Sequence, residues 1–177
     1  DASVPGGSGG GAIFINASDT IIINWSIAAN GRNGTSDGNG AGGGSGGSIW
    51  LIASTFAVNG TINASGGLGG DGINGDGGAG GGGRSAIYYT TKTFNGVISA
   101  AGGRRTFQVG GAGTIFTKQD SQTYGDLLIS NEGNFGANTT IQENGAFDSF
   151  NMSRGASVII NGSFRINASF VNISDAW

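Results

Sequence analysis

One segment of this chain has a shape that recurs three more times. Residues 48–67 read as two short strands and a turn, and similar segments occupy residues 12–31, 86–103 and 114–133. Each segment opens on an Ile followed by an aromatic residue, and this pair recurs after 36, 38 and 28 residues. Repetition at intervals of roughly 20 to 50 residues is typical of stacked units, none of which can bury its apolar face alone.

The repeats define two columns of apolar residues. The first is Ile13-Phe14, Ile49-Trp50, Ile87-Tyr88 and Ile115-Phe116, and the second is Ile27, Ile62, Ile98 and Leu128. If equivalent residues stack, each fully buried Ile contributes roughly 1.5–3 kcal/mol. We therefore predict an all-β chain folded as a parallel β-solenoid (β-helix) with Gly-rich inserted segments. The alternative is an antiparallel β-sandwich, which gives no reason for columns that stay in register.

Three segments between the repeats are rich in glycine: residues 31–47, 66–85 and 102–113. Gly makes up 39 of the 177 residues, and each interior Gly costs a helix roughly 1 kcal/mol relative to Ala, so no helix is expected there. Two interpretations remain open. The segments are either flexible loops, or ordered polyproline-II-like strands that pack where only Gly permits close backbone approach.

The Gly-rich insertions stop after Gly133. Residues 1–133 are predicted to form the Gly-rich part of the solenoid, and residues 134–177 to continue it in shorter rows within one continuous domain. The chain begins at Asp1 without Met, which indicates a processed form or a piece of a longer protein. It ends at Trp177 in a strand-like segment without a polar cap, so we expect end-to-end stacking or strand donation between copies.

The run GGGSGGSIWLIA, followed by VNGTINASGGLGG and GGGGRSAIYY, resembles the Gly-rich repeats of large surface and adhesin-like β-helix proteins of bacteria, archaea and some protists. The run GGAGTIFTKQDSQTYGDLLISNEG is similar to the segment that often follows such repeats. This resemblance covers roughly residues 6–133. It implies a β-solenoid at the cell surface and brings no catalytic residues with it.

The strongest local motif is Asn-x-Ser/Thr, the acceptor sequence for N-glycosylation. About three copies would be expected by chance from the 17 Asn and 32 Ser or Thr residues of the chain, and ten are present. They begin at Asn16, Asn24, Asn33, Asn59, Asn63, Asn138, Asn151, Asn161, Asn167 and Asn172. Some also suit tight turns, where Asn tolerates positive φ. We predict that several carry covalent N-glycans, which requires export and places the protein outside the cell.

Other functional classes find little support in the composition. The eight Lys and Arg residues are scattered, so no nucleic-acid groove is predicted, and no apolar run is long enough to span a membrane. The chain has no His and no Cys, which removes the commonest catalytic bases and nucleophiles. We predict neither an enzyme nor a cofactor. Residues 66–74 fit a calcium-binding nonapeptide once, but that site needs tandem copies, so Asp37, Asp71 and Asp76 are expected to be solvated loop residues.

Two functions from different classes follow from these observations. The first is a structural protein of an extracellular filament, sheath or adhesin, a homopolymer or part of a larger surface assembly. The second is a carbohydrate-binding module, with Phe14, Trp50, Tyr88 and Phe116 as a sugar platform on one face. The same aromatic column is also compatible with ordinary packing, in the core or beneath the Gly-rich segments.

Overall fold

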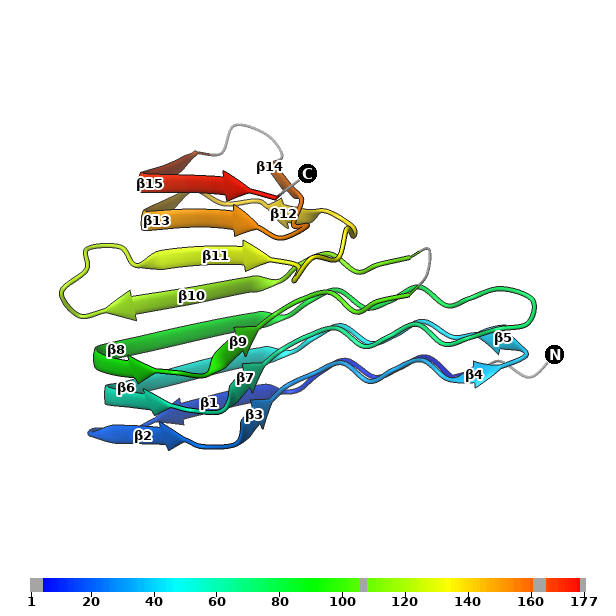
Figure 1. Ribbon diagram of the computed structural model, residues 1–177, viewed down its shortest axis with the longest axis horizontal. Coiled ribbons are helices and arrows are strands. Elements are labelled where there is room, and N and C mark those ends of the chain that lie inside the picture. The colour runs from blue at the N-terminus through cyan, green and yellow to red at the C-terminus, as the bar shows by residue number, and fades with distance from the viewer. Residues whose placement is uncertain (1–4, 106–107, 161–164, 176–177) are drawn as a thin grey trace.

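The computed structural model describes residues 5–105, 108–160 and 165–175. Within these ranges the chain forms fifteen β-strands and no helix, as the composition predicts. Most of the strands lie on one side of the molecule, and the Gly-rich segments project from them as long paired arms (Figure 1). The fold class predicted from the sequence, all-β, is therefore confirmed.

Eight strands form one mixed, mostly parallel sheet. Its order is β1-β6-β8-β10-β11-β13-β15, and β2 pairs with the second half of the long, bent strand β6. The bounds are β1 Ala12–Asn16, β2 Thr20–Ile23, β6 Ser48–Val58, β8 Arg84–Phe94, β10 Thr114–Gln119, β11 Asp126–Ser130, β13 Gly145–Ser153 and β15 Ile166–Ser174. All pairs in this sheet are parallel except β10 with β11.

The remaining strands form three small sheets. Two are parallel, β3-β7-β9 and β12-β14, and the antiparallel pair β4-β5 lies at the tip of the first arm. The bounds are β3 Ser26–Ala28, β4 Ser36–Asp37, β5 Asn39–Gly40, β7 Thr61–Asn63, β9 Val97–Ser99, β12 Thr139–Ile141 and β14 Val158–Ile160.

The second predicted column is correct for its first three members. Ile27 pairs with Ile62 and Ile62 with Ile98 along the small sheet β3-β7-β9. In the first column, Ile13 lies opposite Ile49, as predicted. These residues stack directly because parallel pairing in register puts like side chains on the same face of the sheet.

The prediction that Ile87 continues the first column was wrong by two residues. Ile87 lies opposite Leu51, and the partner of Ile49 is Ser85, which in turn lies opposite Ile115. A shift of two residues keeps every side chain on its own face, so apolar alternation alone does not distinguish the two registers. Ser85 is 2% exposed, and its hydroxyl has no hydrogen-bond partner among the described residues.

The prediction that Leu128 continues the second column was also wrong. Leu128 lies in β11, opposite Ile115 of β10, because the chain reverses between these strands (Figure 1). Only residues 120–125 connect β10 to β11, whereas a parallel connection needs a dozen residues or more. Gly125 closes this turn with a φ of 94°, which glycine adopts without strain.

The reversal moves the core to the other face of the large sheet. Phe116 lies opposite both Ala86 and Leu127, so these three side chains share one face, which we call the Phe116 face. Ile115 and Ile49 lie on the other face, which we call the Ile49 face. Successive side chains of a straight strand point to opposite faces, so the two sets remain separate except where a strand such as β6 bends.

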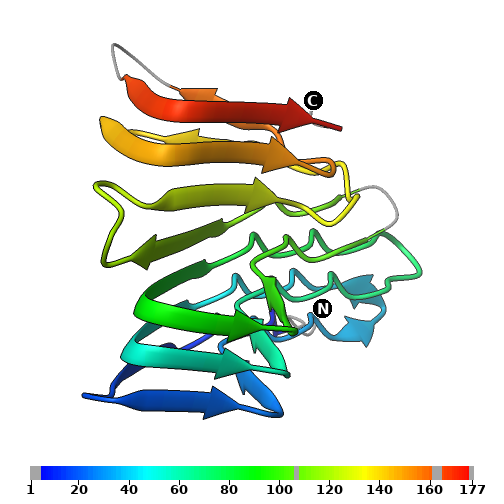
Figure 2. The same cartoon turned by 60° about the vertical axis from the view of Figure 1, so that its left-hand side comes forward.

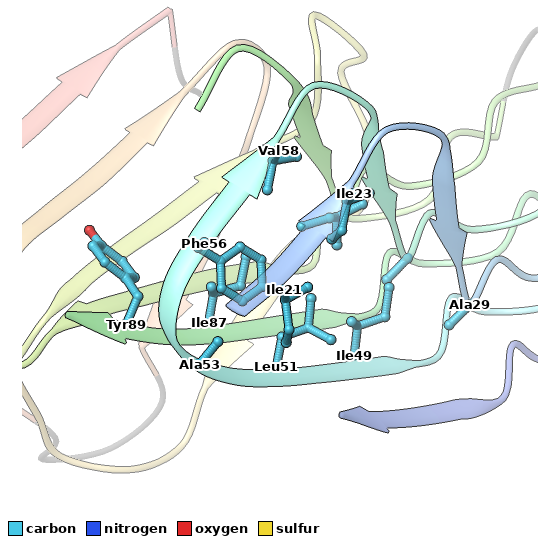
Figure 3. Close-up of a cluster of buried hydrophobic side chains, with 12 residues drawn as sticks. Ile21, Ile23, Ala29, Ile49, Leu51, Ala53, Phe56, Val58, Ile87 and Tyr89 are labelled. Carbon is cyan, nitrogen blue, oxygen red and sulfur yellow. The ribbon is translucent and has the colours of Figure 1, made fainter. Parts of the chain in front are cut away.

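Each face carries one hydrophobic core. The first core, on the Ile49 face, is shown in Figure 3 and consists of Ile21, Ile23, Ala29, Ile49, Leu51, Ala53, Phe56, Val58, Ile62, Ala64, Ile87 and Tyr89. The second core, on the Phe116 face, consists of Ala112, Leu127, Ile129, Phe150, Met152 and Ala156. The sheet is therefore covered on one face before the reversal and on the opposite face after it. Figure 2 shows the strands on both sides of this reversal stacked one above another.

Candidate structural and binding surfaces

The Gly-rich segments pack as paired arms, which we define as residues 29–47, residues 64–83, and residues 100–105 with 108–113. Neighbouring arms are joined by backbone hydrogen bonds three residues apart. The N–H of Gly43 donates to the carbonyl oxygen of Gly78, and that of Gly46 to Gly81, both at 2.8 Å. A spacing of three matches polyproline II, which has three residues per turn and no internal hydrogen bonds. The ordered interpretation of these segments is therefore confirmed over the loop interpretation.

The inner positions of the arms have no room for a side chain. A Cβ atom built on Gly44 would lie 2.0 Å from the carbonyl oxygen of Ser8, and one on Gly80 would lie 2.0 Å from that of Gly44. The outer positions are open, since a Cβ on Gly42 or Gly81 would meet its nearest atom at 3.7 or 3.8 Å. Glycine is thus required by close backbone approach at the inner positions only.

Arg105 lies against two carboxylates of the second arm. It forms an ion pair with Asp71, and its Nε lies 3.6 Å from an oxygen of Asp76. Asp71 and Asp76 are exposed loop residues, as the sequence suggested, and they also face a cation of the neighbouring arm. Within the described ranges, no group of three or more His, Cys, Asp or Glu side chains is placed to hold a metal ion.

Asn131 connects the third arm to the turn that follows β11. Its side chain is 1% exposed. Its Oδ1 accepts from the N–H of Gly102 at 2.7 Å, and its Nδ2 donates to the carbonyl oxygens of Gly110 and Asn134 at 3.0 and 2.8 Å. In the sequence, the only signal for Asn131 is its position just after the last predicted repeat strand.

Stacked polar side chains line the turns between repeats. The Nδ2 of Asn59 donates to Oδ1 of Asn24, and the Nδ2 of Asn95 donates to Oδ1 of Asn59, both at 3.3 Å. Such amide ladders satisfy side-chain donors and acceptors from one repeat to the next. Asn24 and Asn59 also belong to glycosylation motifs, and a glycosylated amide keeps one N–H for this contact.

Most of the glycosylation motifs lie at the surface. The exposed asparagines are Asn16, Asn24, Asn33, Asn59, Asn138, Asn167 and Asn172. Asn63 and Asn151 are half-buried, and Asn161 lies outside the described residues. The side-chain oxygen of Asn63 accepts from the N–H and hydroxyl of Ser65, at 3.0 and 2.6 Å. Asn63 is therefore the motif most clearly used in local structure.

An aromatic ladder crosses the large sheet on the Phe116 face. It consists of Phe14, Trp50, Tyr88, Phe116, Phe147 and Phe150, with successive ring centroids between 4.9 and 6.5 Å apart. Phe14 and Trp50 are exposed, whereas Phe150 lies in the second core. Tyr88 is offset by two residues from Trp50, which is still within reach of an aromatic ring.

The rings in the exposed part of the ladder are tilted relative to one another. Phe14 and Trp50 are inclined by 52° to each other, and Trp50 and Tyr88 by 55°, so the rings do not form one flat surface. Tilted contacts of this kind are the preferred arrangement of aromatic pairs. The exposed part of the ladder lies on the sheet, not beneath the glycine arms.

A hollow of the surface lies between the second and third arms and residues 135–140. Glycine, alanine and a few polar residues line it, including Gln108, Asn138 and Thr139, and none of its lining side chains is ionisable. It therefore offers no side chain for general acid–base catalysis. The described residues include no helix long and apolar enough to cross a membrane.

The large sheet is open at both ends. Among the described residues, β1 pairs only with β6, and β15 pairs only with β13. Apolar side chains are exposed at each end, with Phe14 and Ile15 on β1 and with Phe170, Val171 and Ile173 on β15. An open edge with exposed apolar residues is a ready template for pairing with another strand.

No family model, curated protein or solved structure matches this chain.

Proposed function

We propose that this chain is a β-solenoid that acts as a structural subunit of an extracellular surface assembly, such as a filament, sheath or adhesin. It is N-glycosylated and associates end to end with further copies. The observation that carries this proposal is the pair of open sheet edges at opposite ends of the strand stack (Figure 1). Proteins that remain monomeric usually cover or charge such edges.

The parallel pairing of successive repeats supports the solenoid. Ile27, Ile62 and Ile98 lie opposite one another in steps of 35 and 36 residues, and the arms of neighbouring repeats are hydrogen-bonded in the same order. A stack of this kind grows by adding one repeat at a time, because each repeat contacts only its neighbours. A second copy added at either end would likewise contact only the repeat at that end.

The location outside the cell rests on the glycosylation motifs. Seven of the nine motifs within the described ranges have an exposed asparagine. Only 11% of the residues are charged, so glycans would provide the solvated surface that keeps neighbouring assemblies from associating sideways. A structural role uses the stacking, the arms and the open ends, and it requires no reactive side chain.

Protein isolated from its native source is expected to exceed the polypeptide mass of 17.4 kDa by the mass of several glycans. Chemical deglycosylation should bring the mass back to that of the polypeptide. Peptide mapping should find higher occupancy at exposed Asn24 and Asn33 than at Asn63, whose side chain is half-buried and hydrogen-bonded to Ser65. An intact mass equal to that of the bare polypeptide would contradict this part of the proposal.

The purified chain is expected to form linear assemblies whose length rises with protein concentration. Electron microscopy should show filaments, and X-ray diffraction from aligned samples should give a spacing of about 4.8 Å along the filament, because the strands lie across it. Sedimentation velocity at several concentrations provides the matching solution measurement. Monodisperse monomer at the highest concentration, by both methods, would refute end-to-end association.

A further inference from the structure

We infer that the junction between two copies uses the pairing register of a junction already present inside the chain, formed here by the opposite edges of the equivalent strands. Strand β15 of one copy pairs antiparallel with β1 of the next, in the register of the internal pair β10-β11. This inference rests on the proposed end-to-end association and specifies which strands, and which residues, meet.

Strand direction already determines how the two ends can meet. Strands β1, β6, β8 and β10 run parallel, and β11, β13 and β15 run parallel to one another but opposite to the first set. Figure 1 shows β10 pointing against β11, β13 and β15. When a second copy is placed on the first by translation along the stack, β15 therefore meets β1 in antiparallel orientation.

The covered face of the sheet changes at both junctions, in opposite order along the stack. At the internal junction, β10 belongs to the half whose core is on the Ile49 face, and β11 to the half whose core is on the Phe116 face. At the proposed junction, β15 has its core on the Phe116 face and β1 on the Ile49 face. The chain thus already contains one antiparallel strand pair, β10-β11, at which the core changes from one face of the sheet to the other.

The equivalent of Phe116 in the first strand is Phe14. Phe116 lies opposite Ala86, Ala86 lies opposite Trp50, and Trp50 lies opposite Phe14. The four residues therefore occupy one column across the sheet, and both of its ends are phenylalanine. Phe116 is half-buried, whereas Phe14, at the open edge, is 59% exposed.

The equivalent of Leu127 in the last strand is Val171. Leu127 lies opposite Phe150, and Phe150 lies opposite Val171. Inside the chain, Leu127 covers the open side of Phe116. By the same register, Val171 of one copy lies opposite Phe14 of the next. Val171 is 53% exposed in the isolated chain, whereas its equivalent Leu127 is buried.

The register also matches the neighbouring residues. The internal pair of Thr117 with Asp126 corresponds to a pair of Ile15 with Phe170 on the Ile49 face. Both residues are exposed in the isolated chain, and cross-strand pairs of aromatic and β-branched residues stabilise antiparallel strands by roughly 0.2–1 kcal/mol each. The junction thus replaces a polar internal pair with an apolar one.

Cysteine cross-linking tests this register directly, because the chain contains no natural Cys. The variants Ile15→Cys and Phe170→Cys are mixed in equal amounts and oxidised, and the disulfide-linked dimer is measured on a non-reducing gel. The diagonal control mixes Ile13→Cys with Phe170→Cys. The matched mixture should give about tenfold more linked dimer, since diagonal residues are about 7–8 Å apart and a disulfide needs Cβ atoms about 4 Å apart.

A second mixture, Phe14→Cys with Val171→Cys, tests the same register from the opposite face of the sheet. Each variant oxidised alone should give little linked dimer, and circular dichroism should show an unchanged β-sheet signal. Equal cross-linking of the matched and diagonal mixtures, or none in either, overturns the register. If filaments still form in that case, end-to-end association stands and only the proposed junction fails. If the unmodified chain also stays monomeric, both fail.

Discussion

Replacing Gly80 with Ala is expected to destabilise the protein by about 3 kcal/mol or more, at the upper end of what overpacking costs. The new Cβ would lie 2.0 Å from the carbonyl oxygen of Gly44 and 2.4 Å from its carbonyl carbon. Both atoms belong to the backbone of the neighbouring arm, whose hydrogen bonds hold it in place, so no side-chain rotation relieves the contact. Urea or thermal unfolding measures the effect.

The adjacent residue provides a matched control. A Cβ on Gly81 would meet only the carbonyl oxygen of Gly111, at 3.8 Å, which is an ordinary contact. Because Ala restricts the unfolded chain more than Gly does, Gly81→Ala is expected to be neutral or to stabilise by up to about 1 kcal/mol. If both variants lose stability equally, or neither does, the arms are not packed backbone to backbone.

The contrast between Gly80 and Gly81 separates two explanations of a glycine-rich sequence. A flexible segment would tolerate alanine equally well at every position. A packed polyproline-II arm tolerates a side chain only where its backbone faces away from the other arms, as at Gly81, whereas Gly80 and Gly82 on either side of it are closed. The sequence alone left both explanations open, because composition reports how many glycines a segment contains but not which of them face a neighbour.

Features that repeat from one strand to the next could be predicted. Ile27, Ile62 and Ile98 stack as expected, because each is apolar, lies at the same offset from a turn and has an equivalent in the neighbouring repeats. The asparagine ladder at Asn24 and Asn59 was predictable for the same reason. When every repeat contributes a like residue to a column, the sequence alone indicates the register between neighbouring strands.

Features that occur once could not be predicted in the same way. The repeat alignment placed Ile87 with Ile49, since a two-residue shift preserves the face of every side chain. The reversal between β10 and β11 was missed because the segment has the same apolar residues as the other repeats. Only its short connection, residues 120–125, distinguishes a hairpin from another parallel turn. The change of core face follows from that reversal.

Asn131 is also a feature that occurs once, so no repeat pattern could predict its role. Replacing Asn131 with Asp is expected to have the second large effect on the stability of the protein. Asp retains an oxygen for the N–H of Gly102 but places a carboxylate against the carbonyl oxygens of Gly110 and Asn134. Two donated hydrogen bonds are lost and a buried charge gains no partner for its second oxygen, so we expect a loss of about 3 kcal/mol or more at neutral pH.

The pH dependence of Asn131→Asp identifies the cause of this loss. Burial and the two facing carbonyl oxygens favour the neutral carboxyl and therefore raise its pKa in the folded state above that of the unfolded chain. A raised folded-state pKa means that stability is highest at acid pH and falls as the pH rises through that pKa. The difference in unfolding free energy from the unmodified protein should therefore be smaller near pH 4 than at pH 7.

The same substitution at Asn134 is the control for Asn131→Asp. Asn134 contributes its backbone carbonyl to the network, and its side chain makes none of these three contacts. Asn134→Asp should therefore change stability by no more than about 0.5 kcal/mol, with no comparable pH dependence. Equal effects at the two positions would mean that added negative charge, not the hydrogen bonds of Asn131, destabilises the protein. A larger loss of stability at Asn131 than at Asn134 would show that the hydrogen bonds of the Asn131 side chain hold the third arm to the turn after β11.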